Sequence, residues 1–527
     1  MKSRARQLSA FSLLVVVLMA VFVRLRLLSI PLERDEGEFA YMGQLMLQGI
    51  PPYKLAFNIK LPGTYAGYAA MMGLFGQTTA GIHFGFLLVN LAALALLFLI
   101  TRQLLDAESA VIACVCYALF SLSPGVLGLQ GHATHLVVLT ALAGLWLLLK
   151  ARSSHRTWSF CWSGIFFGLS FLCKQPGVFF AMFGAAILLR DAVEAPASER
   201  PRQRRRIVAF SAGVALPFLL TCLWMWQAGT FRRFWFWTMI YAPYHAGSVG
   251  EEQVWWQLND FTRHGGGLEL WALAALAGLI ILIIDKQRTE APFIMVSLLG
   301  CSLMALLASL YLFRHYFIVL LPVASLLVAV AVRAAARRAG WATAGGCFAV
   351  ACAAFIFVNR AVWFQMPPDA VSRSLYQREP FPEAVEIARY IRAHSREDDS
   401  IEVLGSEPEI YFYAHRHSAS GYLYMYDLTK PGQFAPAMQR EMMHDIETAQ
   451  PLYLIDVHVP TSWAITMNSG LEIIQWSSDY ARQHYDLAGK IVLGAGTNAD
   501  YLWGPEAATR ETNAWMYVSV LKRKPGR

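Results

Sequence analysis

The feature that most constrains this chain is a series of apolar segments that recur from residue 9 to about residue 358. A helix of about 20 apolar residues spans the roughly 30 Å hydrocarbon core of a bilayer. Of the 527 residues, 56% are hydrophobic and only 15% are charged, which is unlike a soluble globular protein. The pattern predicts a polytopic α-helical membrane protein with about eleven transmembrane helices, at 9–30, 80–101, 107–123, 132–151, 158–173, 176–190, 207–227, 268–285, 291–312, 315–333 and 341–358.

The basic residues gather in short loops between these segments. The clusters are "MKSRAR" at the start, "KARSSHR" at 150–156, "RPRQRRR" at 200–206, "DKQR" at 285–288 and "RAAARR" at 333–338. Such clusters are typical of cytoplasmic loops, so the net charge of +8 indicates topology and not nucleic-acid binding. With the N-terminus inside, every cluster is cytoplasmic. The segments 31–79, 124–131, 174–175, 228–267 and the tail from 359 then lie outside, and the apolar stretch 64–76 is expected to be half-inserted.

The first 30 residues have two interpretations, a cleaved signal peptide or a retained first span. No A-x-A-like site follows the apolar core, which favours retention. Arg24 and Arg26 are then either snorkelling anchors or part of a polar site near the outer surface. All eight cysteines lie in apolar segments, so we expect no disulfide in the tail.

The tail changes character near residue 364. Residues 382–395 have helical periodicity, whereas 400–405, 451–458 and 514–523 are typical of strands. This alternation predicts a small α/β domain. The expected organisation is a transmembrane domain at 1–363, with an external loop at 31–79, and an extracytoplasmic α/β domain at 364–527.

Polar residues interrupt the apolar pattern where segments end on the expected outer side. They are Asp35, Glu36, Glu38, Lys60, His132, His135, Lys174, Gln175, Arg314, His315 and Tyr316. A carboxylate there suits removal of a proton from a hydroxyl nucleophile, and the cations suit binding of a phosphate that leaves. At a membrane surface, these residue types fit attack on a sugar that is attached to a lipid phosphate.

Each of these residues also has a purely structural explanation. Asp35 and Glu36 fit the capping of a helix that begins at "EGEFAYMGQLML". Lys60 and Lys174 fit interface anchors, and the "RHY" at 314–316 fits an interface belt. His132 and His135 are three residues apart and share a helix face, which is more often hydrogen-bonded structure than a metal site.

Several longer stretches resemble a known superfamily. They are "RDEGEFAYMGQLMLQGIPPY" from residue 34, "IKLPG", "FLCKQPG", "FRRFWFWT", "FRHYFIVLLP" and "SEPEIYFYAHRHSASGYLY" at 406–424. In this order they resemble the GT-C membrane glycosyltransferases, which include protein O-mannosyltransferases and the lipid A aminoarabinose transferase. The likeness is greatest to bacterial members described as dolichyl-phosphate-mannose-protein-mannosyltransferase-like.

The resemblance implies an inverting glycosyltransferase that moves a monosaccharide from a polyprenyl-phosphate donor to a hydroxyl of an extracytoplasmic acceptor. It implies that Asp35 is the general base and that Lys60 contacts the donor phosphate. Lys174 stands where the family often has Lys before Pro, and Glu36 matches the acidic neighbour of the base. The expected substrate-binding residues are Glu36, Lys60, His132, His135, Lys174, Arg314, His315 and Tyr316.

The chain departs from the family pattern at one place. Many relatives carry a second acid where this chain reads Ala133-Thr134-His135. A histidine does not reproduce the charge of a carboxylate, although it serves as a base or a donor near neutral pH. The sequence assigns no metal ligand and neither requires nor excludes a divalent cation, so the cofactor stays open.

The expected location is the bacterial inner (plasma) membrane, with the N-terminus cytoplasmic and the C-terminal domain periplasmic. The expected partners are the bilayer, a polyprenyl-phosphate sugar and a glycan, lipid or protein acceptor, with no nucleic acid. Two alternatives stay open. One is a lipid or glycolipid transporter, whose polar residues would line a path through the membrane. The other is a non-catalytic protein that binds glycolipid.

Overall fold

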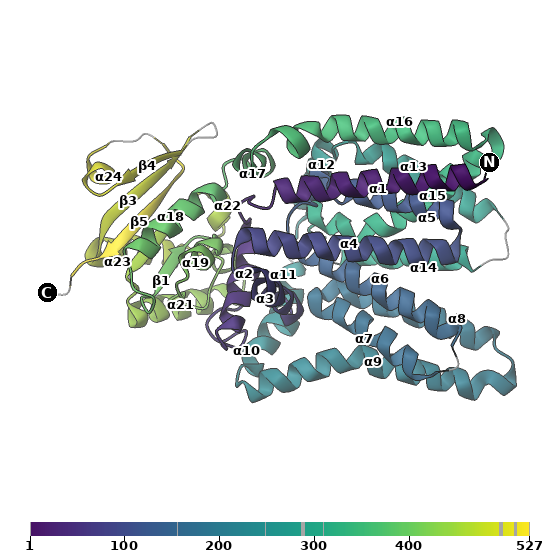
Figure 1. Cartoon of the computed structure of the whole chain (residues 1–527). Helices are drawn as coiled ribbons and strands as arrows, with labels where there is room; N and C mark the ends of the chain where they lie inside the picture. Colours follow the sequence, from purple (N-terminus) through teal and green to yellow (C-terminus); the bar gives the residue numbers. More distant parts are fainter. Residues whose placement is uncertain are drawn as a thin grey trace.

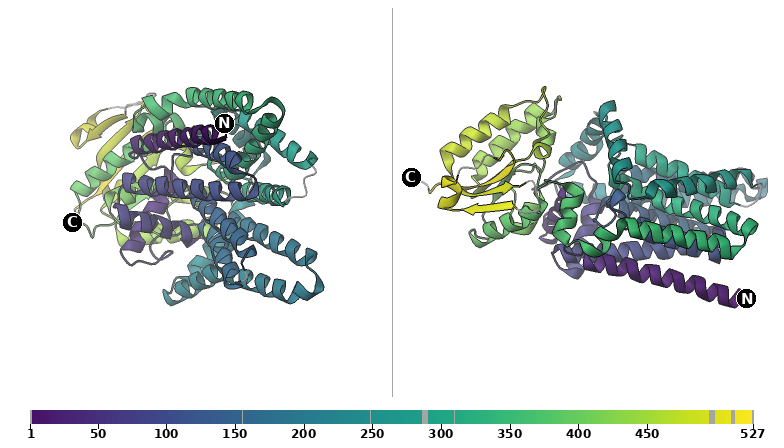
Figure 2. Two further views of the ribbon diagram at one scale, coloured as in Figure 1. Left: turned by 45° about the vertical axis from the view of Figure 1, so that its right-hand side comes forward. Right: turned by 90° about the horizontal axis from the view of Figure 1, so that it is seen from above.

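The computed structural model describes residues 2–154, 156–247, 249–285, 290–308, 310–494, 499–510 and 514–525. A long helical bundle occupies one end and a small sheet with its helices occupies the other (Figure 1). The N-terminus lies at the end of the bundle that is far from the sheet (Figure 1 and Figure 2, right). Most of the basic cluster at 285–288 lies outside the described residues.

The helices of the bundle follow the apolar segments closely. They are α1 (Lys2–Arg26), α4 (Thr79–Leu104), α5 (Ala107–Phe120), α6 (Ala133–Arg152), α7 (Trp158–Cys173), α8 (Val178–Glu194), α9 (Arg200–Gln227), α13 (Leu268–Ile284), α14 (Ala291–Leu307), α15 (Leu321–Ala339) and α16 (Trp341–Arg360). Short elements join them at η1 (Pro124–Val126), η2 (Gln175–Gly177), η3 (Ala197–Glu199), η5 (Arg314–Leu320) and η6 (Ala361–Gln365).

Six helical stretches of the described chain are long and apolar enough to cross a membrane, and a bent pair, α12 (Glu251–His264) with α13, makes a seventh. The three shorter apolar helices α5, α7 and α14 lie in the same bundle. A membrane protein with several spanning helices is therefore confirmed, and the number of about eleven stays a prediction.

Two arginines near the end of α1 bind backbone oxygens. Arg24 is buried and donates hydrogen bonds to the carbonyl oxygens of Ser121 and Gly128, at 2.8 and 2.9 Å. Arg26 donates to carbonyls at the end of η6, including that of Trp363 at 3.4 Å. Both side chains therefore tie α1 to neighbouring loops, a role that neither sequence interpretation included.

Short helices lie between the bundle and the sheet (Figure 1). Two come from the loop after α1, namely α2 (Arg34–Leu47) and α3 (Pro62–Phe75). The others are α10 (Phe231–Trp235), the π-helical η4 (Phe236–Tyr241) and α11 (Ala242–Ala246). The stretch 64–76, which the sequence identified as a short apolar segment, thus belongs to α3.

The C-terminal part contains a five-stranded sheet of order β1-β2-β5-β3-β4. Its strands are β1 (Ile401–Leu404), β2 (Tyr453–His458), β3 (Tyr485–Leu493), β4 (Ala499–Trp503) and β5 (Tyr517–Arg523). β1 and β2 are parallel and the other pairs are antiparallel. The helices are α17 (Pro368–Tyr376), α18 (Phe381–Ala393), α19 (Glu409–Ala414), α20 (Tyr426–Thr429), α21 (Ala435–Ala449), α22 (Pro460–Trp463), α23 (Glu472–His484) and α24 (Pro505–Thr509).

The expected α/β class of the tail is confirmed, with β3 and β4 as additions to the expected strands. The domain boundary at residue 363 and the outer placement of the tail stay predictions. The tail packs directly on the loop after α1. Gly37 of α2 lies so close to α19 that a Cβ there would be 2.5 Å from the Glu409 nitrogen, and the backbone N–H of Ser418 donates to the Tyr41 hydroxyl at 2.8 Å.

Candidate active site at the end of the bundle

The acidic segment begins helix α2, and Glu33 is its N-cap. The Glu33 carboxylate accepts the Glu36 backbone N–H at 3.0 Å, and the Glu36 carboxylate accepts the Glu33 N–H at 3.3 Å. This reciprocal capping box satisfies two donors of the first turn. Capping therefore explains Glu36, whereas the Asp35 carboxylate faces Lys60.

Asp35 and Lys60 form an ion pair at the base of the site. The Lys60 Nζ lies 3.5 Å from Asp35 Oδ1 and 4.0 Å from Glu38 Oε2. Burial on its own would raise the pKa of Asp35, but the nearby charge of Lys60 holds it below its usual value. The pKa of Lys60 is raised, because its two carboxylate neighbours outweigh the effect of burial. Both groups are therefore charged.

The position of Lys60 is set by the start of α3. Pro62 begins this helix, and the Thr64 hydroxyl donates to the Cys173 carbonyl at the end of α7 at 2.5 Å. Gly63 permits this contact, since a Cβ there would lie 2.5 Å from the Leu172 carbonyl oxygen. The start of α3 is thereby held against the loop that carries Lys174.

Lys174 is a buried lysine without a carboxylate partner in the described parts of the chain. Its Nζ lies 3.3 Å from the centre of the Tyr316 ring, a cation–π contact. No carboxylate lies within ion-pair distance of it in the described parts of the chain. Burial, and then the charge of Lys60, hold the pKa of Lys174 well below its usual value. The arrival of an anion would favour the protonated form of this buried amine.

Two histidines from distant segments stack beside Asp35. The rings of His132 and His315 are 4.0 Å apart and nearly parallel, at 10°. His315 Nε2 lies 3.8 Å from Asp35 Oδ2, and His132 Nδ1 lies 3.6 Å from Glu33 Oε1. Neither nitrogen of His132 has a hydrogen-bond partner within the described residues, and burial lowers the pKa of His132 to about 4. His132 is therefore neutral and has its hydrogen-bonding capacity available.

Asp35, His132 and His315 also offer three metal-ligand atoms within 4.8 Å of one another. Neutral imidazoles and a carboxylate are suitable ligands for Zn²⁺ and similar cations. However, an imidazole binds a cation in the plane of its own ring, and two stacked rings in nearly parallel planes cannot both do so unless one ring turns. The ammonium of Lys60 would also repel a cation. The geometry as it stands fits a metal poorly, and the cofactor stays open.

Glu36 is fully buried and uses its oxygens within the protein. Its Oε1 contacts His83 Nε2 at 2.9 Å and accepts the Gly131 N–H at 2.5 Å. His83 in turn contacts the Leu28 carbonyl oxygen at 2.9 Å. Glu36 thus connects α2 to α4 and to the loop before α6, which is a positioning role beside the expected binding role.

Glu38 connects the site to the C-terminal part. It accepts the Tyr65 hydroxyl at 2.7 Å and the Tyr424 hydroxyl at 2.9 Å. Burial, the largest cause, raises the pKa of Glu38 to about 7, although Lys60 acts in the opposite direction. The sequence marked Glu38 and the stretch around Tyr424 but gave no signal that they meet.

The remaining expected residues lie further from the acidic pair. His135 is buried on α6 against Phe86, with ring centres 6.0 Å apart, and makes no ion pair within the described chain. Arg314 lies 3.3 Å from Asp260 of α12 and donates to the Leu375 carbonyl at 3.0 Å. The structure therefore brings together Asp35, Lys60, His132, Lys174, His315 and Tyr316.

Comparisons with known proteins agree with this architecture. A family model described as dolichyl-phosphate-mannose-protein mannosyltransferase matches residues 62–226. The match includes His132 and Lys174 but begins after Asp35 and Lys60. No curated protein sequence matches the chain.

Solved structures match nearly the whole chain. ArnT from Cupriavidus metallidurans bound to undecaprenyl phosphate matches with a TM-score of 0.59 and 13% identity, covering 97% of each chain. The apo oligosaccharyltransferase of Archaeoglobus fulgidus matches with a TM-score of 0.52 and 13% identity, covering 94% of this chain and 74% of that one. A complex of the latter with Zn and sulfate has a TM-score of 0.51 at 14% identity, with 93% and 72% covered.

The chain therefore has the fold of the GT-C membrane glycosyltransferases, and the resemblance inferred from its sequence is confirmed. Within that class it is similar to ArnT over its full length and to the mannosyltransferase family in the first half of its bundle. These likenesses support its assignment as a glycosyltransferase.

Proposed function

We propose that this protein is an inverting glycosyltransferase that moves a monosaccharide from a polyprenyl-phosphate donor to a hydroxyl of an extracytoplasmic acceptor. The observation that carries the proposal is the cluster at the end of the bundle. There a charged carboxylate, Asp35, lies 3.5 Å from a charged ammonium, Lys60, and near a second, buried lysine, Lys174, that has no carboxylate partner in the described chain. The fold match to an ArnT that holds undecaprenyl phosphate supports the choice of donor.

The donor phosphate binds between Lys60 and Lys174 in this proposal. Lys60 precedes α3 and Lys174 follows α7, and the hydrogen bond from Thr64 to the Cys173 carbonyl holds these two positions together. Lys174 has no carboxylate partner within the described chain. The neutral His132 donates a hydrogen bond to a phosphate oxygen from its unpartnered ring. Lysine and imidazole donors of this kind stabilise the charge that develops on a leaving phosphate.

Asp35 acts as the general base. It takes the proton of the acceptor hydroxyl while the acceptor oxygen forms a bond to the anomeric carbon. The bond from that carbon to the phosphate oxygen breaks on the opposite face, and its electron pair leaves with the polyprenyl phosphate. One displacement inverts the anomeric centre, and the phosphate gains one negative charge that the two lysines compensate.

The proposed location is the bacterial inner membrane, with the N-terminus cytoplasmic and residues 364–527 on the periplasmic side. In support, the N-terminus and the C-terminal sheet lie at opposite ends of the bundle (Figures 1 and 2). Because the candidate site adjoins the sheet end, this orientation puts it on the periplasmic side of the membrane.

The test compares the lipids that copurify with the wild type and with Asp35→Asn when each protein is purified from native membranes. We expect the Asn variant to insert and fold, to lose transfer by about 10²–10⁴-fold, and to retain a polyprenyl-phosphate sugar detectable by mass spectrometry. Asp479→Asn, an exposed residue of α23, is the matched control and should behave as the wild type. An Asp35→Asn protein that still transfers sugar would contradict the mechanism. Absence of the lipid from both proteins would favour transport or glycolipid binding without turnover.

A further inference from the structure

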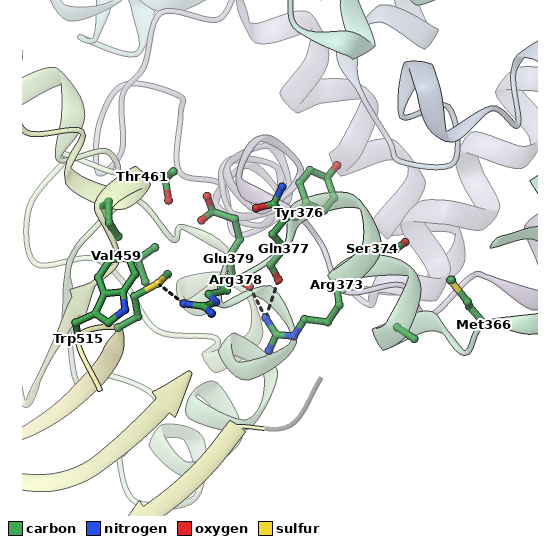
Figure 3. Close-up of a pocket in the computed structure, with 13 residues that line it drawn as sticks. Met366, Arg373, Ser374, Tyr376, Gln377, Arg378, Glu379, Val459, Thr461 and Trp515 are labelled. Carbon is green, nitrogen blue, oxygen red and sulfur yellow. Dashed lines mark hydrogen bonds between the residues drawn. The ribbon is translucent and has the colours of Figure 1, made fainter. Parts of the chain in front are cut away.

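A large cavity lies outside the acidic site, between the last bundle helix and the sheet. Its volume is about 790 Å³, and it is lined by Met366, by α17 and the turn after it, by residues 459–461 and by residues 515–516. Figure 3 shows Trp515 and Val459 on one wall and the side chains of α17 on the other. A cavity of this size holds a ligand of one to two sugar rings with a substituent.

An arginine with available donors faces this cavity. Arg378 makes one weak contact, with the Met516 sulfur at 3.9 Å, and has no carboxylate partner within the described residues. The neighbouring Arg373 is engaged by contrast, since it donates to the Glu383 carboxylate and to the Glu379 carbonyl. A guanidinium with free donors at a partly buried position is suited to bind a phosphate or carboxylate in a bidentate manner.

An exposed tryptophan stands at the rim of the same cavity. Trp515 is 66% exposed, although large aromatic side chains are usually covered in a folded domain. Its ring offers a flat apolar face with a polar N–H at the edge, which suits the faces of sugar rings. Arg378 and Trp515 together offer charge and stacking to one ligand.

The lining of the cavity contacts the residue next to Asp35. Glu379, which lines it, pairs at 2.9 Å with Arg34, the residue directly before Asp35. Burial, and then the charges of Glu33 and Glu36, raise the pKa of Tyr376 well above its usual value. The Tyr376 hydroxyl has no hydrogen-bond partner in the described structure. A ligand in the cavity thus touches the residues that border the acidic segment.

We propose that this cavity binds the acceptor, and that the acceptor is a saccharide carrying a phosphate or carboxylate. Arg378 binds the anionic group, Trp515 stacks on a ring, and the reacting hydroxyl extends past Tyr376 toward Asp35. The inference rests on the proposed transferase function, since it assigns the second substrate of that reaction. The same chemistry is offered by a soluble oligosaccharide and by the headgroup of a glycolipid.

The test uses the full-length protein in nanodiscs and a cysteine at the cavity rim. Ser374 lines the cavity and is exposed, so Ser374→Cys, in a Cys347→Ser background, reports occupancy through its rate of labelling by a thiol reagent. We expect saturating maltose 1-phosphate or maltobionate to slow labelling at least about five-fold, and neutral maltose to have little effect. A cysteine at Ser478 on α23, remote from the cavity, should label at an unchanged rate.

Arg378→Ala should raise the concentration of anionic sugar needed for half-maximal protection by about 10–100-fold, the loss expected for hydrogen bonds to a charged group. Arg378→Lys should lose part of it, and Trp515→Ala should also weaken it. Arg389→Ala, an exposed arginine of α18, is the matched control. Thermal unfolding identifies any variant that does not fold. If Arg378→Ala does not fold, the protection measured with Arg378→Lys tests the role of Arg378.

A diacylglycerol conjugate of the same phosphorylated disaccharide separates the two sources of ligand. Stronger protection by the conjugate than by the free sugar assigns a glycolipid, and equal protection assigns a soluble glycan. Absence of protection by both anionic sugars, or equal protection by maltose, would overturn the inference. The protection assay needs no turnover, so it tests the cavity separately from the mechanism. If Asp35→Asn shows protection and also transfers sugar, the proposed mechanism is contradicted and the assignment of the cavity is not.

Discussion

At the scale of single residues, the site contains charges that differ in how well they are compensated. Lys60 has two carboxylate neighbours, whereas Lys174 has an aromatic ring and no carboxylate in the described chain. A buried polar group without a partner reduces the stability of a folded protein unless a ligand pairs with it. Lys174 is therefore explained better by a bound anion than by anchoring at the interface.

We predict that Lys174→Met raises the donor concentration needed for half-maximal transfer by about 10–100-fold, since a charge-assisted contact to the phosphate is lost. The same change should leave the thermal midpoint of the protein without donor unchanged or higher, because a desolvated polar group is removed. Transfer kinetics and thermal unfolding in detergent provide both values. The control is Lys150→Met, in the last turn of α6. A lower thermal midpoint in Lys174→Met with unaltered transfer kinetics would indicate that Lys174 is purely structural.

At the scale of elements, the contact between α3 and α7 determines where the two lysines lie. Gly63 makes this contact possible, whereas a Cβ at Gly73 in the same helix would lie 3.6 Å from the Leu47 side chain, an ordinary packing distance. Gly63→Ala should displace α3 from the Leu172 carbonyl, and we expect it to lower both the thermal midpoint and transfer. Gly73→Ala should instead be neutral or raise the midpoint, because alanine favours helix by about 0.5–1 kcal/mol. Equal behaviour of the two variants in thermal unfolding and transfer would show that the close contact has no such role.

At the scale of the whole molecule, the proposed orientation predicts which surfaces meet each side of the membrane. In intact cells with a permeabilised outer membrane, a thiol reagent that cannot cross the inner membrane should label Ser478→Cys in the C-terminal part. It should fail to label Ser153→Cys, in the loop after α6, until the inner membrane is opened. Both positions are exposed, and Cys347→Ser removes the exposed native thiol. Labelling of Ser153→Cys in sealed cells would reverse the assignment of sides.

The sequence predicted the helices well because length and apolarity determine a membrane span locally. For example, the segment expected at 158–173 is helix α7 from Trp158 to Cys173. It also placed Asp35 and Lys60 in one external loop. Contacts between distant segments had no such local signal. The stacking of His132 on His315 and the bond from Tyr424 to Glu38 depend on tertiary packing alone. The cap on Glu33 was missed because serine, threonine and aspartate are the more common N-caps.

The shared position of Lys60 has a consequence for the order of the reaction. In the proposed mechanism one ammonium serves both the carboxylate of Asp35, which it holds in its weakly basic form, and the phosphate of the donor. Arrival of the donor draws the ammonium away and makes the carboxylate a stronger base. An enzyme without donor would thus have little power to deprotonate a hydroxyl or water. Productive turnover then follows a compulsory sequence, with the lipid-linked sugar first and the acceptor second.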